Sequence, residues 1–197
     1  MPSVFLVSDT HFGHTGVCRF VRNDGVTKLR PWDTADEMDE FMVKAWNERV
    51  RPTDKVYHLG DVVINRKALG IMRRLNGDKV LIRGNHDIFK DIDYREHVRE
   101  LRAYHVMNGM ILSHIPIHSE SLGRFGVNIH GHLHANRVML PGFNGKITDI
   151  VDVRYHCVCV EQTDFAPILF EDVIKRFEAE GGVVGFQNGN GTTQVTM

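Results

Sequence analysis

The chain has 197 residues, of which 42% are hydrophobic and 25% charged, as expected for one globular domain large enough to bury a core. Its formal net charge of -1 excludes a strongly basic overall surface of the kind that attracts nucleic acid, and its three cysteines are too few for a disulfide framework. Twelve histidines are unusual, because imidazole is the commonest metal ligand among side chains.

The N-terminal residues do not suggest a signal peptide, and no apolar run suggests membrane insertion. The N-terminal residues lack the basic and apolar regions of a signal peptide, and no apolar run approaches the ~20 residues of a membrane-spanning helix. We therefore expect a cytoplasmic protein without membrane contact. Cys157 and Cys159 alternate with valines, so we interpret them as buried structural thiols on one face of a strand.

In the first half of the chain, short apolar runs alternate with helical patterns. The first run, residues 4–7, is β-branched in part and stops at a polar segment, which predicts a buried strand. Apolar residues then recur at three- and four-residue steps, which predicts a helix with one apolar face. The predicted strands are 4–7, 55–59 and 79–83, and the predicted helices are 35–49, 66–75 and 94–101.

The second half contains more strands and fewer helices. We predict strands at 110–112, 126–129 and 150–160, and a final helix at 168–179. Residues 1–180 are expected to form one domain, followed by a polar, flexible tail at 181–197. Strand-helix alternation predicts a partly parallel sheet, and the later strands favour a second, mixed sheet. In such folds reactive groups collect beyond the carboxyl ends of strands.

Five polar segments each follow one of the apolar runs. Each supplies side chains with lone pairs for a divalent cation, and an alternating pair such as Asp9 and His11 can point toward one ion from an extended backbone. Glycines at 60, 84 and 131 allow the backbone to approach closely or to adopt conformations that a β-carbon forbids. The segments are Asp9-Thr10-His11, Gly60-Asp61, Gly84-Asn85-His86-Asp87, Ser113-His114 and Gly131-His132-Leu133-His134.

These segments resemble, in content and order, the pattern DxH, GD, GNH[DE], lone His and GHxH of the calcineurin-like metallophosphoesterase superfamily. Each alone is weak, but five in order, from Asp9 to His134, cover about two thirds of the chain. The surroundings are similar to small, uncapped bacterial and phage members. The resemblance implies an α/β fold in which two mixed β-sheets pack as a sandwich flanked by helices, in four α/β/β/α layers.

The resemblance also implies a dinuclear metal centre. One ion would be held by Asp9, His11, Asp61 and His134, and the second by Asp61, Asn85, His114 and His132. Asp61 would bridge the two ions together with a water or hydroxide, which would attack the phosphorus. His86 would contact the phosphate and protonate the leaving oxygen, and Asp87 would orient His86.

The donor set and its charge are suited to phosphate chemistry. Two divalent ions bring four positive charges, and Asp9, Asp61 and a bridging hydroxide offset three, which leaves attraction for an anionic ester. Mixed imidazole, carboxylate and amide ligands favour Mn²⁺, Fe or Zn²⁺, with Ni²⁺ or Co²⁺ also compatible, over Mg²⁺ or Ca²⁺. We expect Mn²⁺ because small members of the family commonly use it.

Several other residues have no assigned role. His14 and His118 lie near the motifs and are candidates for contacting the substrate, while a structural role is favoured for each. Arg83 and the Arg30-Pro31-Trp32 corner could bind phosphate or a base, but we favour Arg83 pointing away from the site and the corner packing as a loop. His58 and His130 are interpreted as wall residues.

The leading functional hypothesis is a phosphodiesterase acting on a nucleotide-like or other small phosphodiester, because the absence of a large cap favours an open groove. Nucleic acid is a chemically similar substrate that nothing in the composition indicates. A phosphomonoesterase or protein phosphatase is the first alternative. A non-catalytic scaffold is the second, and it is disfavoured because every motif residue is present. The oligomeric state is not predicted.

Overall fold

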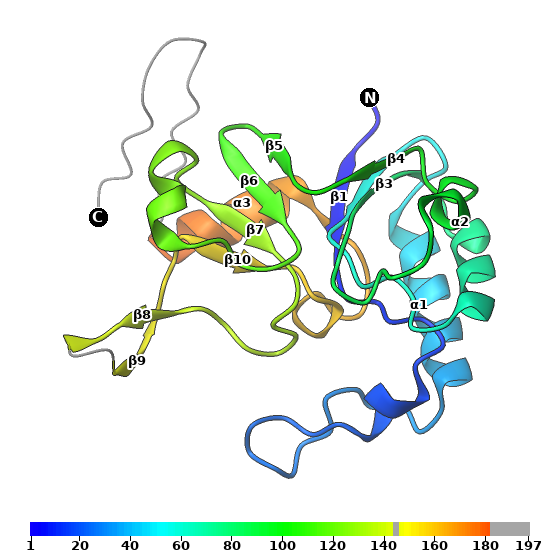
Figure 1. Cartoon of the computed structure of the whole chain (residues 1–197), viewed down its shortest axis with the longest axis horizontal. Helices are drawn as coiled ribbons and strands as arrows, with labels where there is room; N and C mark the ends of the chain where they lie inside the picture. The colour runs from blue at the N-terminus through cyan, green and yellow to red at the C-terminus, as the bar shows by residue number, and fades with distance from the viewer. Residues whose placement is uncertain (144–145, 182–197) are drawn as a thin grey trace.

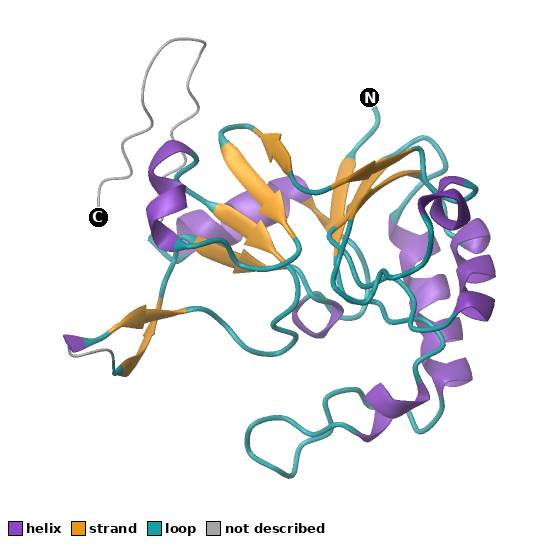
Figure 2. Cartoon of the chain, viewed as in Figure 1, coloured by secondary structure: helices purple, strands orange, loops and turns teal. Residues whose placement is uncertain are grey.

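The computed structural model describes residues 1–143 and 146–181. Two β-sheets lie side by side in the body of the molecule, and a two-stranded hairpin extends from it (Figure 1). Helices lie outside the first sheet and next to the second, while long loops connect the strands (Figure 2). The expected α/β sandwich with mixed sheets is confirmed.

The first sheet has five strands in the order β11-β1-β2-β3-β4. Strands β1 to β4 pair in parallel, and β11 pairs antiparallel with β1. Parallel pairing places the carboxyl ends of β1, β2 and β3 at the same edge. The strands are β1 (Val4–Val7), β2 (Lys55–His58), β3 (Asp78–Ile82), β4 (Glu100–Arg102) and β11 (Ile168–Leu169).

The second sheet has four strands in the order β10-β7-β6-β5. Strands β6, β7 and β10 are parallel, and β5 is antiparallel to β6. The remaining pair, β8 and β9, forms the extended hairpin (Figure 1). The strands are β5 (His105–Met107), β6 (Met110–Ser113), β7 (Asn128–His130), β10 (Tyr155–Cys157), β8 (Met139–Pro141) and β9 (Ile147–Val151).

Helical elements flank the sandwich. The longest, α1, starts at the cap residue Thr34, whose side chain accepts a hydrogen bond from the Glu37 amide at 3.2 Å. The α-helices are α1 (Ala35–Arg49), α2 (Asp91–Arg95) and α3 (Phe170–Ala179). The 3₁₀ helices are η1 (Thr15–Arg19), η2 (Arg66–Arg74), η3 (Ser119–Arg124) and η5 (Val160–Gln162). Of these, α1 and η2 pack on the outer face of the first sheet and η3 on that of the second, whereas α3 packs into the cluster between the sheets.

Successive side chains of a strand point to opposite faces, so β1 contributes to two cores. Phe5 and Val7 pack with α1 residues such as Trp46, whereas Leu6 packs between the sheets with Leu112 and Ile129. A third, smaller cluster lies on the outer face of the second sheet beneath η3. The order is therefore helix, sheet, sheet, helix, with each interface apolar.

Several predicted elements have different boundaries or types. Residues 94–101 are not a helix: α2 ends at Arg95, and the chain then adds β4 to the sheet edge. The predicted strand at 150–160 is divided among β9, β10 and η5, and η2 is a 3₁₀ helix. The predicted final helix begins as the short strand β11. Of the predicted tail, only Gly181 lies within the described residues.

Among the described residues, none of the helices has the length and apolar character needed to cross a membrane.

Candidate metal centre

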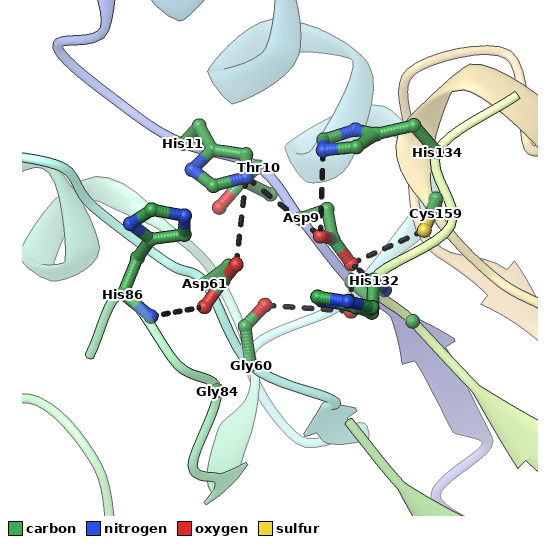
Figure 3. Close-up of polar contacts among 12 residues, drawn as sticks. Asp9, Thr10, His11, Gly60, Asp61, Gly84, His86, His132, His134 and Cys159 are labelled. Atoms are coloured by element: carbon green, nitrogen blue, oxygen red, sulfur yellow. Dashed lines mark hydrogen bonds and ion pairs between the residues drawn. The ribbon is translucent and has the colours of Figure 1, made fainter. Parts of the chain in front are cut away.

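The five motif segments begin where five parallel strands end. In the first sheet, Asp9, Asp61 and Asn85 follow β1, β2 and β3, and in the second sheet His114 and His132 follow β6 and β7. The structure brings these strand ends to one edge shared by both sheets, and the motif side chains converge there (Figure 3). The placement follows from parallel pairing within each sheet.

Asp9, His11 and His134 form one group whose potential ligand atoms lie within 4.8 Å of one another. His11 Nε2 lies 3.7 Å from Asp9 Oδ1, and His134 Nε2 lies 3.9 Å from the same oxygen. These separations are too long for hydrogen bonds. They agree with donor atoms each about 2.1 Å from one ion, which lie roughly 3–4 Å apart.

Asp61, His114 and His132 form the second group. His114 Nε2 lies 3.4 Å from Asp61 Oδ2. Asn85 Oδ1 lies 2.8 Å from His114 Nε2 and 3.0 Å from His132 Nδ1, which places the amide oxygen in the same group. The two groups share a boundary at Asp61, because its Oδ2 also lies 3.7 Å from His11 Nε2. This is the position that a bridging carboxylate requires.

The donors in the second group are arranged for a cation. His114 Nδ1 lies 2.8 Å from the carbonyl oxygen of Leu59, which can only accept a hydrogen bond, so Nδ1 carries a proton. In the neutral ring, Nε2 is then a lone-pair donor facing the oxygens of Asp61 and Asn85. Three lone-pair groups pointing together repel unless a cation or an added proton lies between them. The residues therefore fit a divalent ion.

The first group has the same character. Asp9 Oδ1 is buried and has no hydrogen-bond partner, although it faces two imidazoles. Burial works against the charge of Asp9, but the neighbouring imidazole of His11 and the charges of His114 and His134 lower its pKa. Without an ion, protons compensate: although burial opposes it, hydrogen bonding and nearby carboxylates raise the pKa of His114 and His134.

Five of the seven predicted ligands have left-handed backbone conformations. Their φ values lie between 49° and 69°, a region that non-glycine residues seldom adopt. The extended backbone expected for Asp9 and His11 is therefore wrong, because both residues turn instead. Such strain is concentrated at functional sites, where surrounding contacts enforce it. The five residues are Asp9, His11, Asp61, His132 and His134.

Two motif glycines leave room for the carboxylates. A β-carbon on Gly84 would lie 2.2 Å from Asp61 Oδ1 and 2.5 Å from the Asp61 backbone nitrogen. A β-carbon on Gly131 would lie 2.0 Å from Ser8 Oγ and 2.5 Å from Asp9 Oδ2. Each glycine thus permits a close backbone approach to one predicted ligand, as expected from the sequence.

Of the predicted catalytic pair, His86 lies at the exposed side of the centre and Asp87 lies beneath it. His86 is exposed, its ring centroid is 5.4 Å from that of His11, and its backbone amide donates to Asp61 Oδ1 at 2.8 Å (Figure 3). Asp87 is buried and does not hydrogen bond to the His86 ring. Its carboxylate accepts hydrogen bonds from the backbone amides of Asp61 and Gly84, each at 2.8 Å, and of Val62 at 3.1 Å. Asp87 therefore holds the two loops together.

The structure places the unassigned residues as follows. The His14 ring is tilted against the His11 ring, with their centroids 5.7 Å apart, whereas His118 is exposed immediately before η3. Arg83 donates to the Asp87 carbonyl and to Asp91, away from the ligands. His58 is buried against Trp46, and burial lowers its pKa to about 3.

Three contacts to the ligands were not predicted from the sequence. Ser8 Oγ donates to Asp9 Oδ2 at 2.5 Å. The Cys159 thiol lies 3.1 Å from the same oxygen (Figure 3). Burial raises the pKa of Cys159, which keeps the thiol protonated as a donor. Glu161 accepts from His134, and Arg30 is completely buried beside it. No local motif marks Ser8 or Glu161.

Comparisons with known proteins agree with the site. The calcineurin-like phosphoesterase family matches residues 2–181. An uncharacterized protein of Methanocaldococcus jannaschii is 35% identical over 189 residues, which cover 93% of this chain and 96% of that protein. The Gene 66 protein of Mycobacterium phage D29 is 33% identical over 53% of this chain and 49% of its own length.

A solved structure has a similar fold. It is a protein of unknown function from Aquifex aeolicus, with a TM-score of 0.58 and 24% identity, covering 89% of this chain and all of that one. The chain belongs to the calcineurin-like phosphoesterase family, whose members are metal-dependent hydrolases of phosphoesters. Two clusters of histidine and aspartate suited to divalent metals accompany that fold.

Proposed function

We propose that the protein is a dinuclear metal-dependent phosphodiesterase acting on a nucleotide-like or other small phosphodiester. The observation that carries this proposal is the position of Asp61, whose Oδ2 lies 3.7 Å from one group's His11 and 3.4 Å from the other group's His114. A pair of ligand groups joined by one carboxylate suits two ions a few ångströms apart.

When bound, the two cations would activate a water as hydroxide and neutralise charge on the phosphoryl oxygens. The residues of the chain would adjust the charge of the centre and supply the proton for the leaving oxygen. Asp9 and Asp61 limit the positive charge, while His86 at the exposed side of the centre would hold the proton that the leaving oxygen takes. The Asp87 carboxylate accepts hydrogen bonds from the backbone amides of Asp61 and Gly84, and so fixes the position of His86 relative to the ligands.

Charge and exposure favour a diester over a monoester. A diester carries one negative charge, and a monoester carries up to two. Arg30 and Arg83, the two arginines considered from the sequence as phosphate-binding candidates, are both engaged in other hydrogen bonds. Asn85, His86 and His132 are exposed, which leaves this side of the centre open to a substituent on the phosphate. We propose Mn²⁺ as the activating ion, because imidazole, carboxylate and amide donors suit it.

The test is hydrolysis of bis(p-nitrophenyl) phosphate and p-nitrophenyl phosphate by the same metal-free preparation reloaded with Mn²⁺, Zn²⁺, Fe²⁺, Co²⁺, Ni²⁺ or Mg²⁺. We expect the diester to be cleaved faster, with Mn²⁺ most effective. Lys175→Ala, a change to an exposed residue of α3 whose side chain pairs with Asp172, serves as control and should retain wild-type rates. A preference for the monoester would contradict the diester assignment, and inertness toward both with two ions bound would contradict hydrolysis.

A further inference from the structure

A completely buried arginine lies behind the first ligand group. Arg30 comes from the surface loop before α1, yet its side chain is inaccessible to solvent. Its guanidinium donates to the backbone carbonyls of Asp9 at 2.6 Å and Thr10 at 2.7 Å. Because these carbonyls belong to the turn that carries Asp9 and His11, Arg30 holds that turn in its left-handed conformation.

The same guanidinium makes an ion pair with Glu161. Arg30 Nε and Nη2 lie 2.8 Å and 2.7 Å from Glu161 Oε1, and both side chains are inaccessible to solvent. Glu161 belongs to η5, which follows β10 of the second sheet, so the pair links this element to the Asp9–Thr10 turn after β1. A buried carboxylate without this partner would be strongly unfavourable.

Glu161 in turn determines how His134 faces the centre. Its Oε1 lies 3.1 Å from His134 Nδ1, and a carboxylate can only accept, so Nδ1 carries the proton. Nε2 is then left with its lone pair, and it is the atom that lies 3.9 Å from Asp9 Oδ1. A carboxylate that accepts from the outer nitrogen of a ligating histidine fixes both the tautomer and the ring orientation.

Arg30 also limits the charge of the centre. Glu161 alone would add a third carboxylate beside Asp9 and Asp61 and weaken attraction for an anionic ester. The paired guanidinium cancels that charge while leaving the hydrogen bond to His134 intact.

We propose that Arg30 and Glu161 are positioning residues for the ion held by Asp9, His11 and His134, acting through the Asp9–Thr10 backbone and the His134 ring. The inference rests on the dinuclear centre of the proposed function, and it assigns the pair to one of the two ions. Neither residue belongs to a motif that marks the ligands.

The test is calorimetric titration of the metal-free full chain with Mn²⁺. In wild type we expect two ions to bind. Glu161→Gln should weaken one of them about 10–100-fold, the usual effect of removing such a partner, and leave the other within threefold. Arg30→Lys should weaken the same ion, because a point charge cannot reproduce the four directed contacts of the guanidinium to Glu161, Asp9 and Thr10. In the double variant, the factor by which Mn²⁺ affinity falls should be smaller than the product of the factors in the two single variants.

A matched control distinguishes positioning of a metal ligand by Glu161 from a general contribution of a buried ion pair to stability. Asp152 is also buried and pairs with Arg154, 2.6 Å away, within its own turn. Asp152→Asn should lower the melting temperature without changing either Mn²⁺ affinity. If Glu161→Gln weakens both ions equally, or neither, the proposal is wrong. These affinities do not depend on turnover, so a wild type that binds two ions but hydrolyses no ester would overturn only the proposed function.

If Glu161→Gln does not fold, the tautomer of His134 can still be measured in the wild-type protein. In ¹⁵N-histidine-labelled, metal-free protein near pH 8, the His134 signal should show the proton on Nδ1, and Zn²⁺ should shift Nε2. A His134→Gln spectrum assigns the signal. A proton on Nε2 in the neutral, metal-free ring would overturn the tautomer that the proposal requires.

Discussion

Gly84→Ala tests whether close backbone packing shapes the metal centre. The added carbon would lie 2.2 Å from Asp61 Oδ1 and 2.5 Å from the Asp61 backbone nitrogen, both about 1 Å inside ordinary van der Waals contact. The nitrogen cannot rotate away as a side chain can, so the loops must separate. Overpacking of this kind costs about 1–3 kcal/mol, and we expect about 3 kcal/mol here. For a domain of this size that lowers the melting temperature by roughly 6–12 °C.

The variant should also bind metal poorly, since Asp61 lies between both ligand groups. Gly123→Ala is the matched control, because its β-carbon would meet nothing within 4 Å. It should leave stability within about 1 kcal/mol and metal content unchanged. Thermal unfolding and elemental analysis of both variants measure these outcomes. A Gly84→Ala protein with two bound ions and the wild-type melting temperature would refute the packing argument.

Three further changes have defined outcomes. His86→Ala should retain both ions but lose about 10²–10⁴ in kcat, most with a poor leaving group; unchanged turnover would exclude a proton-donor role. Asp61→Ala should lose both ions by elemental analysis, and retention of two would contradict the bridging position. Burial raises the pKa of Asp39 to about 6 from an ordinary 3.8, so its charge destabilises the fold as pH rises from about 4 to 6. The melting temperature of Asp39→Asn minus that of wild type should therefore increase from about pH 4 to pH 6. A difference that stays constant over this range would contradict the raised pKa of Asp39.

The sequence predicts the parts of the fold in which local pattern and tertiary packing agree. The helix at 35–49 was located to the residue because its apolar spacing and the Thr34 cap coincide. The helix predicted at 94–101 was wrong because Glu100–Arg102 gains more by pairing with β3, a long-range contact that local propensity does not report. The predicted strand at 150–160 was wrong because apolar alternation continues through two turns.

The candidate site was predictable for a different reason. Its ligands follow strands, and parallel pairing carries strand ends to a common edge whatever the loop lengths. Glu161 and Arg30 were not predictable, because they reach the centre from η5 and a surface loop through contacts 131 residues apart. The predicted contact of Asp87 with the His86 ring is replaced in the structure by hydrogen bonds from three backbone amides to the Asp87 carboxylate.

Because each ligand group contains residues that follow strands of both sheets, a bound ion would cross-link the two sheets. Asp9 and Asp61 follow strands of the first sheet, whereas His114, His132 and His134 follow strands of the second. Unfolding must then release the ions, so occupancy adds stability of about 2.7 kcal/mol per site at a hundred times the dissociation constant. The difference between melting temperatures recorded with and without a chelator would report how much metal each preparation contains. Resistance to proteolysis should increase with the same metal content.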